Sequence, residues 1–253
     1  MSWIDNYPEI SAMMPYICTG CGVEGSQFED IFPHHCKPIS LAQILSLFRE
    51  NNEKLIKNIT TKLGRIMIDS HRKGSKFLEL SPWNIFAHSS GVVMVGEPNP
   101  QKAYQSPETL TGNRQSCSSD VWSFGVIMAG LFLKKQCFHI PNSVIDQDQR
   151  KAIILNMQFK SLGVPTQEVL EHIALDKEQA DKIHANFAAY SKTDMNVTVT
   201  LHEELTNARI PQGAYDIIMK CLNVDHTQRP TMEEIMSMSW FNENARRSEN
   251  EFA

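Results

Sequence analysis

The chain has 253 residues, of which 42% are hydrophobic and 21% are charged, a balance typical of one large globular domain. Its formal net charge of −5 argues against a general binder of phosphate backbones, so no nucleic-acid partner is expected. The opening MSWIDNYPEI lacks the basic and apolar regions of a secretory signal, and the longest apolar run, Phe124 to Leu133, is about half of a membrane span. We therefore expect an intracellular, cytoplasmic protein without membrane insertion.

Residues 1–38 form a Cys-, Pro- and Gly-rich segment that predicts short extended pieces and turns. Cys18 and Cys21 form a C-x-x-C pair, and His34 and Cys36 follow in the same segment. One interpretation is a tetrahedral zinc site with these four residues as ligands. The alternative is buried free thiols, because His34 and Cys36 are closer in sequence than paired zinc ligands usually are.

From Ile39 onward, apolar residues recur at three-to-four spacing, which predicts two helices or one broken helix. Ser40 is the expected cap and Gly74 the expected stop. Two short apolar runs, 84–87 and 92–95, flank HSSG and predict a small β-hairpin. Residues 96–107 contain three prolines and predict a loop.

A second helical region is predicted from residue 118 to the end of the folded part. Ser118-Ser119-Asp120 is expected to cap a helix, VWSFGVIMAGLFL, that is apolar on nearly every face and therefore buried. Later segments predict helices over 146–190 with a break at LGVP, a polar connection over 191–203, and closing helices around 214–221 and 232–240, the last capped by Thr231. The fold class is mainly α with one domain over 39–241 and a polar tail over 242–253.

Several motifs, in their order and spacing, resemble the C-terminal lobe of a protein kinase. Kinases carry a catalytic loop H-R-D-L-x-x-x-N, followed by D-F-G and A-P-E. Here Phe77-Leu78-Glu79 stands in the H-R-D position, with Asn84 five positions after Glu79. Residues 97–99, Glu-Pro-Asn, stand in the D-F-G position, and residues 106–108, Ser-Pro-Glu, replace A-P-E. The resemblance implies a kinase-like C-terminal lobe whose N-lobe is absent or vestigial, because so little chain precedes the first helix.

The residues that maintain this fold in kinases have counterparts here. Asp120 and Trp122, in SDVWSFGVIMAG, resemble the start of the buried central helix, where the Asp accepts backbone N–H bonds from the catalytic loop. Arg229, in HTQRPTMEEI, matches the Arg that forms a buried ion pair with the A-P-E Glu, here Glu108. The alternative is that these charges are ordinary solvated side chains. LGVPTQEVL resembles an insert of cyclin-dependent and MAP kinases.

The catalytic positions depart from the kinase pattern. Phosphoryl transfer works by positioning a nucleotide and neutralising its charge. Glu79 and Glu97 keep carboxylates and Asn84 keeps an amide that a metal can bind, but Leu78 lacks the Arg charge and Pro98 replaces the D-F-G aromatic. We therefore expect these three positions to be degenerate, with no catalytic residues. A G-x-G-x-x-G match at residues 20–25 is more simply a glycine turn.

The chain most resembles the kinase non-catalytic C-lobe domain (KIND), found in Spir-type actin nucleators. ISLAQILSL and FLELSPWNIFAHSSGVVMV match its opening helix and its catalytic-loop remnant. The resemblance implies a pseudokinase scaffold that binds a peptide or helical segment of another protein, with no cofactor expected. The zinc interpretation of the N-terminal segment rests on the Cys and His pattern alone, and free thiols are its alternative. Trp83 is the candidate partner-binding residue. The length of residues 134–210 and the Cys-rich start depart from the KIND pattern. The alternatives are a divergent serine/threonine kinase that uses ATP and Mg²⁺, and a zinc-bearing structural subunit.

Overall fold

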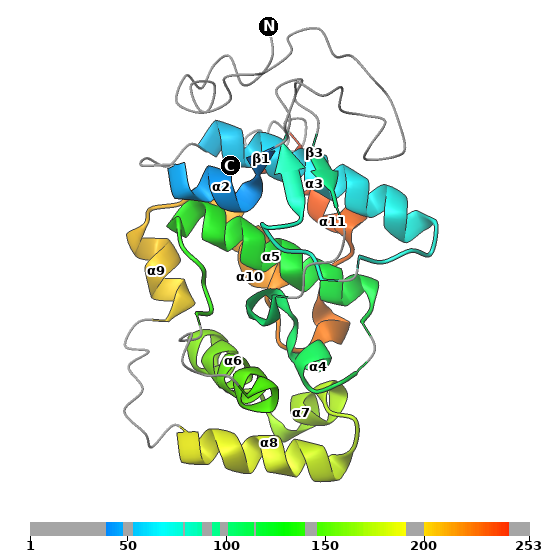
Figure 1. The fold of residues 1–253 in the computed structure, drawn as a ribbon, viewed down its shortest axis with the longest axis vertical. Helices are drawn as coiled ribbons and strands as arrows, with labels where there is room; N and C mark the ends of the chain where they lie inside the picture. Colours follow the sequence, from blue (N-terminus) through cyan, green and yellow to red (C-terminus); the bar gives the residue numbers. More distant parts are fainter. Residues whose placement is uncertain are drawn as a thin grey trace, which may run out of the picture.

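The computed structural model describes residues 39–47, 53–77, 79–87, 93–96, 101–113, 115–139, 146–190 and 200–242. The described part is mainly helical, as expected, with a small antiparallel sheet (Figure 1). The N-terminal segment 1–38 and the tail after Asn242 lie outside these residues, so the expectation about the upper lobe stays a prediction.

The described elements, in chain order, are β1 (Ile39–Ser40), α2 (Leu41–Leu47), α3 (Glu53–Arg72), β2 (Ile85–Ala87), β3 (Val93–Val95), η2 (Lys102–Tyr104), α4 (Pro107–Leu110), α5 (Cys117–Leu133), α6 (Gln147–Leu162), α7 (Gln167–Ile173), α8 (Lys177–Tyr190), α9 (Leu201–Asn207), α10 (Gln212–Cys221), η3 (His226–Gln228) and α11 (Met232–Ser237).

The sheet contains the predicted hairpin and one strand that the sequence pattern did not indicate. β2 and β3 pair antiparallel, and β1 pairs antiparallel with β2, with Ile39 opposite Ala87. The helical pattern expected from Ile39 therefore begins two residues later, at Leu41. Ser40 still caps it, since its hydroxyl accepts a hydrogen bond from the backbone N–H of Gln43 at 3.2 Å.

Helix α3 packs one apolar stripe against the core. Its buried residues recur every three or four positions, the spacing of one face of an α-helix. After its last turn the chain leaves through Gly74, whose φ of +72° suits glycine, and this was the predicted stop. The turn delivers the chain to the loop that begins at Glu79 and leads into β2 (Figure 1).

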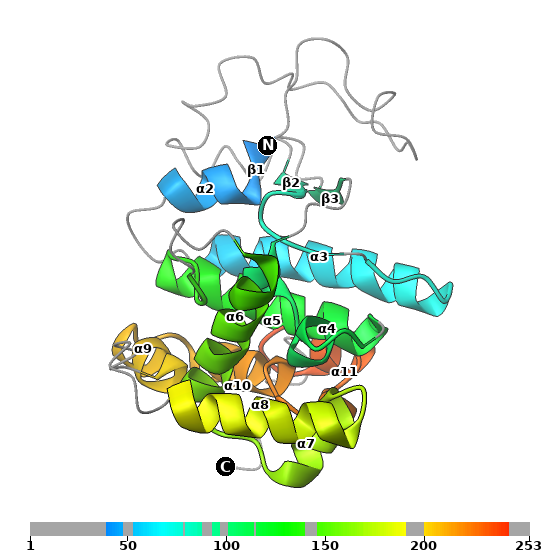
Figure 2. The ribbon, with the colours of Figure 1, turned by 60° about the horizontal axis from the view of Figure 1, so that its bottom comes forward.

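Helix α5 lies at the centre of the described fold, between α3 and α10 (Figures 1 and 2). Nearly all of its residues are buried, as its apolar sequence predicts. Gly125 permits the close approach of α10, because a Cβ atom there would lie 2.6 Å from Cβ of Cys221. The helix begins at Cys117 with Ser116 as its cap, so the predicted Ser118–Asp120 cap was wrong. Ser116 satisfies the free N–H of Ser119, and Ser119 returns the bond.

The end of the molecule opposite the sheet is formed by α7 and α8, with α6 between them and α5 (Figure 1). The predicted LGVP break is present between α6 and α7. Two residues that follow α4 connect to the end of α7. The Thr111 hydroxyl and the Asn113 side-chain amide donate hydrogen bonds to the backbone carbonyl of Ile173, at 2.5 and 2.9 Å.

Two boundaries near the C-terminus differ from the prediction. Helix α9 begins at Leu201, within the predicted polar connection, because Thr200 and Glu203 form a capping box. Helix α11 has the predicted Thr231 cap but ends at Ser237, since Met238 adopts an extended conformation, and Trp240 is buried beyond the helix end.

Candidate functional site

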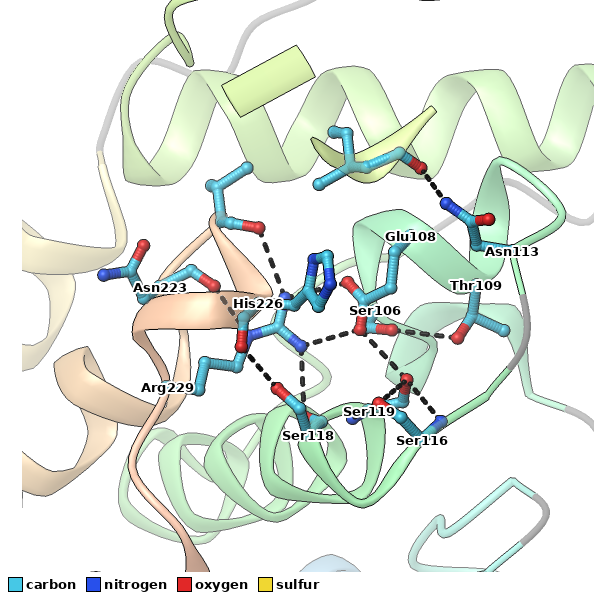
Figure 3. Close-up of polar contacts among 12 residues, drawn as sticks. Ser106, Glu108, Thr109, Asn113, Ser116, Ser118, Ser119, Asn223, His226 and Arg229 are labelled. Atoms are coloured by element: carbon cyan, nitrogen blue, oxygen red, sulfur yellow. Dashed lines mark hydrogen bonds and ion pairs between the residues drawn. The ribbon is translucent and has the colours of Figure 1, made fainter. Parts of the chain in front are cut away.

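A buried ion pair joins α4 to the chain that follows η3 (Figure 3). The Arg229 guanidinium donates two hydrogen bonds to the Glu108 carboxylate, 2.8 Å to Oε1 and 2.9 Å to Oε2. Ser119 on α5 donates a third, 2.9 Å to Oε1. Two parallel bonds between a guanidinium and a carboxylate are a strong, geometrically defined arrangement. The expected contact between Glu108 and Arg229 is therefore present and buried.

The remaining polar atoms of Arg229 are also satisfied. Backbone carbonyls of Asn223, Ser118 and Val224 accept its N–H groups at 2.7, 3.0 and 3.3 Å. The guanidinium carbon lies 4.9 Å from the ring centroid of Trp122, which is fully buried. Hydrogen bonds and stacking of this kind offset the cost of removing a charge from water. Trp122 thus packs against the ion pair, consistent with the expected structural position.

The ion pair sets the protonation of Glu108. Burial by itself raises the pKa of this carboxyl, but the charge and hydrogen bonds of Arg229, with a hydrogen bond from Ser106, bring the pKa below its ordinary value. Glu108 is therefore ionised near neutral pH.

Asp120 lies in the first turn of α5 and faces the end of α3. Its Oδ2 accepts a hydrogen bond from the backbone N–H of Phe77 at 2.9 Å and contacts Nε2 of His71 at the same distance. Burial raises the pKa of Asp120, and the bonds from His71 and Phe77 oppose that rise. The expected support of the catalytic-loop segment is present at Phe77, while Leu78 lies outside the described residues.

Asn84 is buried, and its side chain is used within its own loop. Its Oδ1 accepts from the backbone N–H of Ser81 at 2.8 Å and from the Ser81 hydroxyl at 3.4 Å, while its Nδ2 donates to the carbonyl of Glu79 at 3.1 Å. A backbone N–H can only donate and a backbone carbonyl can only accept, so these partners fix which amide atom is oxygen. The oxygen that a metal would bind therefore already has two donors.

Glu79 combines an unusual backbone with a side-chain contact to a distant segment. Its φ of +67° lies in the left-handed region, where residues other than glycine are uncommon. Its Oε1 accepts a hydrogen bond from Nε2 of Gln105 at 2.8 Å. The structure thus brings Glu79 and Asn84 together in one loop and places Gln105 against the carboxylate.

Trp83, the candidate partner-binding residue, is 40% exposed and lies in the same loop. Its ring meets the ring of buried Tyr104 edge to face, with centroids 5.9 Å apart. Tyr104 is the last residue of η2, and Gln105 follows it directly. One side of Trp83 therefore packs on the protein while the other faces solvent.

The other predicted site residues lie outside the described part of the chain. These are Glu97 and the candidate zinc ligands Cys18, Cys21, His34 and Cys36. Both the carboxylate at the D-F-G position and the zinc site stay predictions. Within the described residues, no group of three or more His, Cys, Asp or Glu is placed to hold a metal ion, and Cys117, Cys137 and Cys221 are free thiols. No described helix combines the length and the apolarity that crossing a bilayer requires.

Three residues of this region were missed by the sequence analysis: Gln105, Gln158 and Ser119 as a donor to Glu108. Gln105 directly precedes residues 106–108 in the A-P-E position, and this neighbourhood was the only sequence signal that could have pointed to it. Gln158 lies on α6 and donates to the carbonyl of Gln105 at 2.8 Å, a contact across 53 positions that no local pattern indicates.

Comparison with known proteins agrees with this geometry. Cyclin-dependent kinase E-1 from Arabidopsis thaliana is 27% identical over 140 residues, which are 54% of this chain and 28% of that protein. The solved MAP kinase LmaMPK10 from Leishmania major superposes with a TM-score of 0.63 at 19% identity, covering 81% of this chain and 55% of that one, so it shows the fold alone. The chain therefore spans less than two thirds of either relative. Residues 31–241 match the protein kinase domain, and the chain belongs to that family.

Proposed function

We propose that this protein is a pseudokinase of the KIND type, a kinase-family module that binds another protein and does not transfer phosphate. The observation that carries the proposal is the inward-turned amide of Asn84, whose oxygen accepts two hydrogen bonds from Ser81. The sequence departures at Leu78, Pro98 and Asn99 point the same way.

The physical argument concerns the metal that phosphoryl transfer requires. Mg²⁺ demands nearly octahedral oxygen ligands at about 2.0–2.1 Å and gives up its water reluctantly. For Oδ1 of Asn84 to become a ligand, the buried N–H of Ser81 would lose its acceptor, which costs about 1–3 kcal/mol. The loop is therefore more stable closed on itself than opened toward a metal.

The partner is expected to be a peptide or helical segment of another protein, seated on the face that exposes Trp83. Tryptophan is enriched among residues that dominate binding energy at interfaces. Trp83 is already held from behind by Tyr104, so little side-chain freedom would be lost on binding. Such a segment would use one of the common modes of peptide recognition.

A thermal-shift titration with ATP and Mg²⁺ tests the absence of nucleotide binding. A ligand at about 100 times its Kd stabilises the native state by about 2.7 kcal/mol, which raises the melting temperature visibly. We expect no rise with ATP and Mg²⁺ together over ATP-free protein. A saturable rise would overturn the proposal.

Recovery of bound proteins by affinity capture, followed by mass spectrometry, tests the partner-binding face. We expect a protein that the wild type captures to be lost with Trp83→Ala and kept with Leu175→Ala. Leu175 is the matched control because it is an exposed apolar residue, 59% accessible, in the connection between α7 and α8. Retention of every captured protein by Trp83→Ala would exclude this face.

A second function, residual phosphotransfer, is favoured by the hydrogen bond from the Asn84 amide to the backbone carbonyl of Glu79, which places both residues in one loop of kinase-family origin. In that case Glu79 would act as the base, and Asn84 with Glu97 would hold Mg²⁺. Label transfer from ATP that disappears in Glu97→Ala would establish this alternative.

A further inference from the structure

We propose that the chain fills its own acceptor site: the side-chain amide of Gln105 occupies the position beside Glu79 where a kinase substrate would present its hydroxyl. In kinases, the carboxylate of the catalytic loop accepts the proton of that hydroxyl. The inference rests on the proposed function, because it treats Glu79 as the remnant of that carboxylate.

The contact itself resembles the one a substrate would make. Nε2 of Gln105 donates to Oε1 of Glu79 at 2.8 Å. An ionised carboxylate can only accept, so the amide must present its NH₂ group there. Like a hydroxyl, this group is a neutral donor, and it satisfies the carboxylate without neutralising its charge.

Gln105 is held in place by helix α6. Nε2 of Gln158, whose side chain is buried, donates to the carbonyl oxygen of Gln105 at 2.8 Å. Oε1 of Gln158 is itself buried and has no donor among the described residues, an arrangement that costs about 1–3 kcal/mol. Gln158 therefore donates to the Gln105 carbonyl in an orientation that leaves its own Oε1 buried without a donor among the described residues. We take this cost as an indication that the hydrogen bond holds Gln105 in position.

Neighbouring residues fix the same segment and the opposing loop. The Ser123 hydroxyl on α5 donates to the carbonyl of Tyr104 at 2.9 Å. The ring of Tyr104 meets Trp83, which belongs to the loop that carries Glu79. Residues 101–105 therefore join α5, α6 and the catalytic-loop remnant through one aromatic contact and three hydrogen bonds.

The consequence is competition. A hydroxyl from another molecule takes the position that Gln105 occupies beside Oε1 of Glu79 only by displacing this amide. A donor within the same chain competes at an effective concentration on the order of millimolar or higher. A weakly bound hydroxyl-bearing peptide would not overcome it, whereas a partner that first moves residues 101–105 would expose the carboxylate.

Carboxylate labelling with a water-soluble carbodiimide and glycine ethyl ester, read by mass spectrometry of the peptide containing Glu79, tests the contact. In the wild type, Glu79 should be labelled much more slowly than Asp148, whose side chain is 89% exposed. Gln105→Ala should accelerate labelling of Glu79 about fivefold, the factor that corresponds to one net hydrogen bond of ~1 kcal/mol.

The chain offers a matched control and a second variant. Gln167→Ala removes the same kind of bond, from Nε2 of Gln167 to Oδ1 of Asp181 at 3.0 Å, and should leave Glu79 unchanged. Gln158→Met releases the Gln105 carbonyl without touching Glu79 and should also accelerate its labelling. This variant decides the test if Gln105→Ala does not fold.

Labelling of Glu79 at the same rate in the wild type, Gln105→Ala and Gln158→Met would overturn the inference. So would a wild-type rate equal to that of Asp148. The ATP and Mg²⁺ titration on the same proteins reports separately on the proposed function. A nucleotide-induced shift together with faster labelling in Gln105→Ala would remove the pseudokinase proposal and leave the occupied acceptor site standing.

Discussion

Two polar centres of this fold use their hydrogen bonds differently. In the ion-pair centre, Glu108 and Arg229 satisfy opposite full charges in the interior, and neighbouring Ser119 completes the set. In the loop centre, the Glu79 carboxylate accepts a hydrogen bond from the neutral amide of Gln105, and the Asn84 side chain bonds to the backbone of Ser81 and Glu79. The first centre joins elements that are distant in sequence, and the second closes the loop that contains Glu79 and Asn84. The comparison shows that the kinase fold has its buried ion pair here, and that the polar side chains of Glu79 and Asn84 have hydrogen-bond partners within the protein.

The largest expected effect comes from breaking the ion pair. Arg229→Met leaves the Glu108 carboxylate buried without its partner, so we expect a loss of about 3–5 kcal/mol in the free energy of unfolding. Urea denaturation measures it. The double variant Glu108→Leu with Arg229→Met should recover part of the loss, because no charge is then stranded. A loss below about 1 kcal/mol would mean that the pair behaves like a surface salt bridge.

Acid should weaken the same centre by a smaller amount, because Arg229 keeps its backbone acceptors when Glu108 is protonated. The folded-state pKa of Glu108 is lowered, so its contribution is fully present above the ordinary pKa of 4.5 and is lost as pH falls through the folded value.

Because the pKa of Asp120 is raised in the folded protein, protonation of Asp120 stabilises the fold as the pH falls, which opposes the effect of Glu108. Asp120 is present in both the wild type and Glu108→Gln, so the difference between their stabilities isolates the contribution of Glu108. Urea denaturation from about pH 7 to about pH 3 should show a steeper loss for the wild type. Parallel curves for the two proteins would contradict the lowered pKa.

In the loop centre, Asn84→Asp should destabilise by about 1–3 kcal/mol, because an oxygen then faces the carbonyl of Glu79 in place of a donor. Asn223→Asp is the matched control. Asn223 also accepts from a nearby backbone N–H, that of Asp225 at 3.0 Å, but in an exposed position, and the change should stay within about 0.5 kcal/mol. Equal stability of Asn84→Asp and the wild type would mean that the Asn84 amide faces outward.

The smallest effect is expected at the exposed edge of the loop. Trp83→Ala should cost about 0.5–1.5 kcal/mol, the range of one aromatic pair, because the half-exposed ring makes one edge-to-face contact, with Tyr104. Leu175→Ala provides the baseline for an exposed apolar residue. A loss above about 3 kcal/mol would place Trp83 among core residues and weaken its assignment to partner binding.

Local signals in the sequence predicted most of the elements, because capping, stop and turn chemistry act over a few residues. Gly74 ends α3, the LGVP break separates α6 from α7, and Thr231 caps α11, all as expected. The cap of α5 was misplaced because Ser116, Ser118 and Ser119 are equivalent candidates until the packing of the helix selects one. Strand β1 was missed since its two residues gain their pairing from β2, far along the chain.

Contacts in the candidate site could be predicted only between residues that belong to a motif of the kinase family. The motif placed Glu108 opposite Arg229 and Asp120 beside the loop, and the structure has those contacts. It gave no indication of the bonds from Gln105 to Glu79 or from Gln158 to Gln105, because glutamines at those positions belong to no pattern and meet through tertiary packing. Asn84 was recognised by position, but its orientation depends on the local fold around Ser81.

The hydroxyl of Ser119 performs two tasks at once. It accepts a hydrogen bond from the backbone N–H of Ser116 in the cap of α5 and donates one to the Glu108 carboxylate. The first turn of the central helix therefore cannot fray without also disturbing the joint between α4 and the chain after η3. Amide protons there should exchange with solvent only when the whole domain opens, so the start of α5 belongs to the last cooperative unit to unfold.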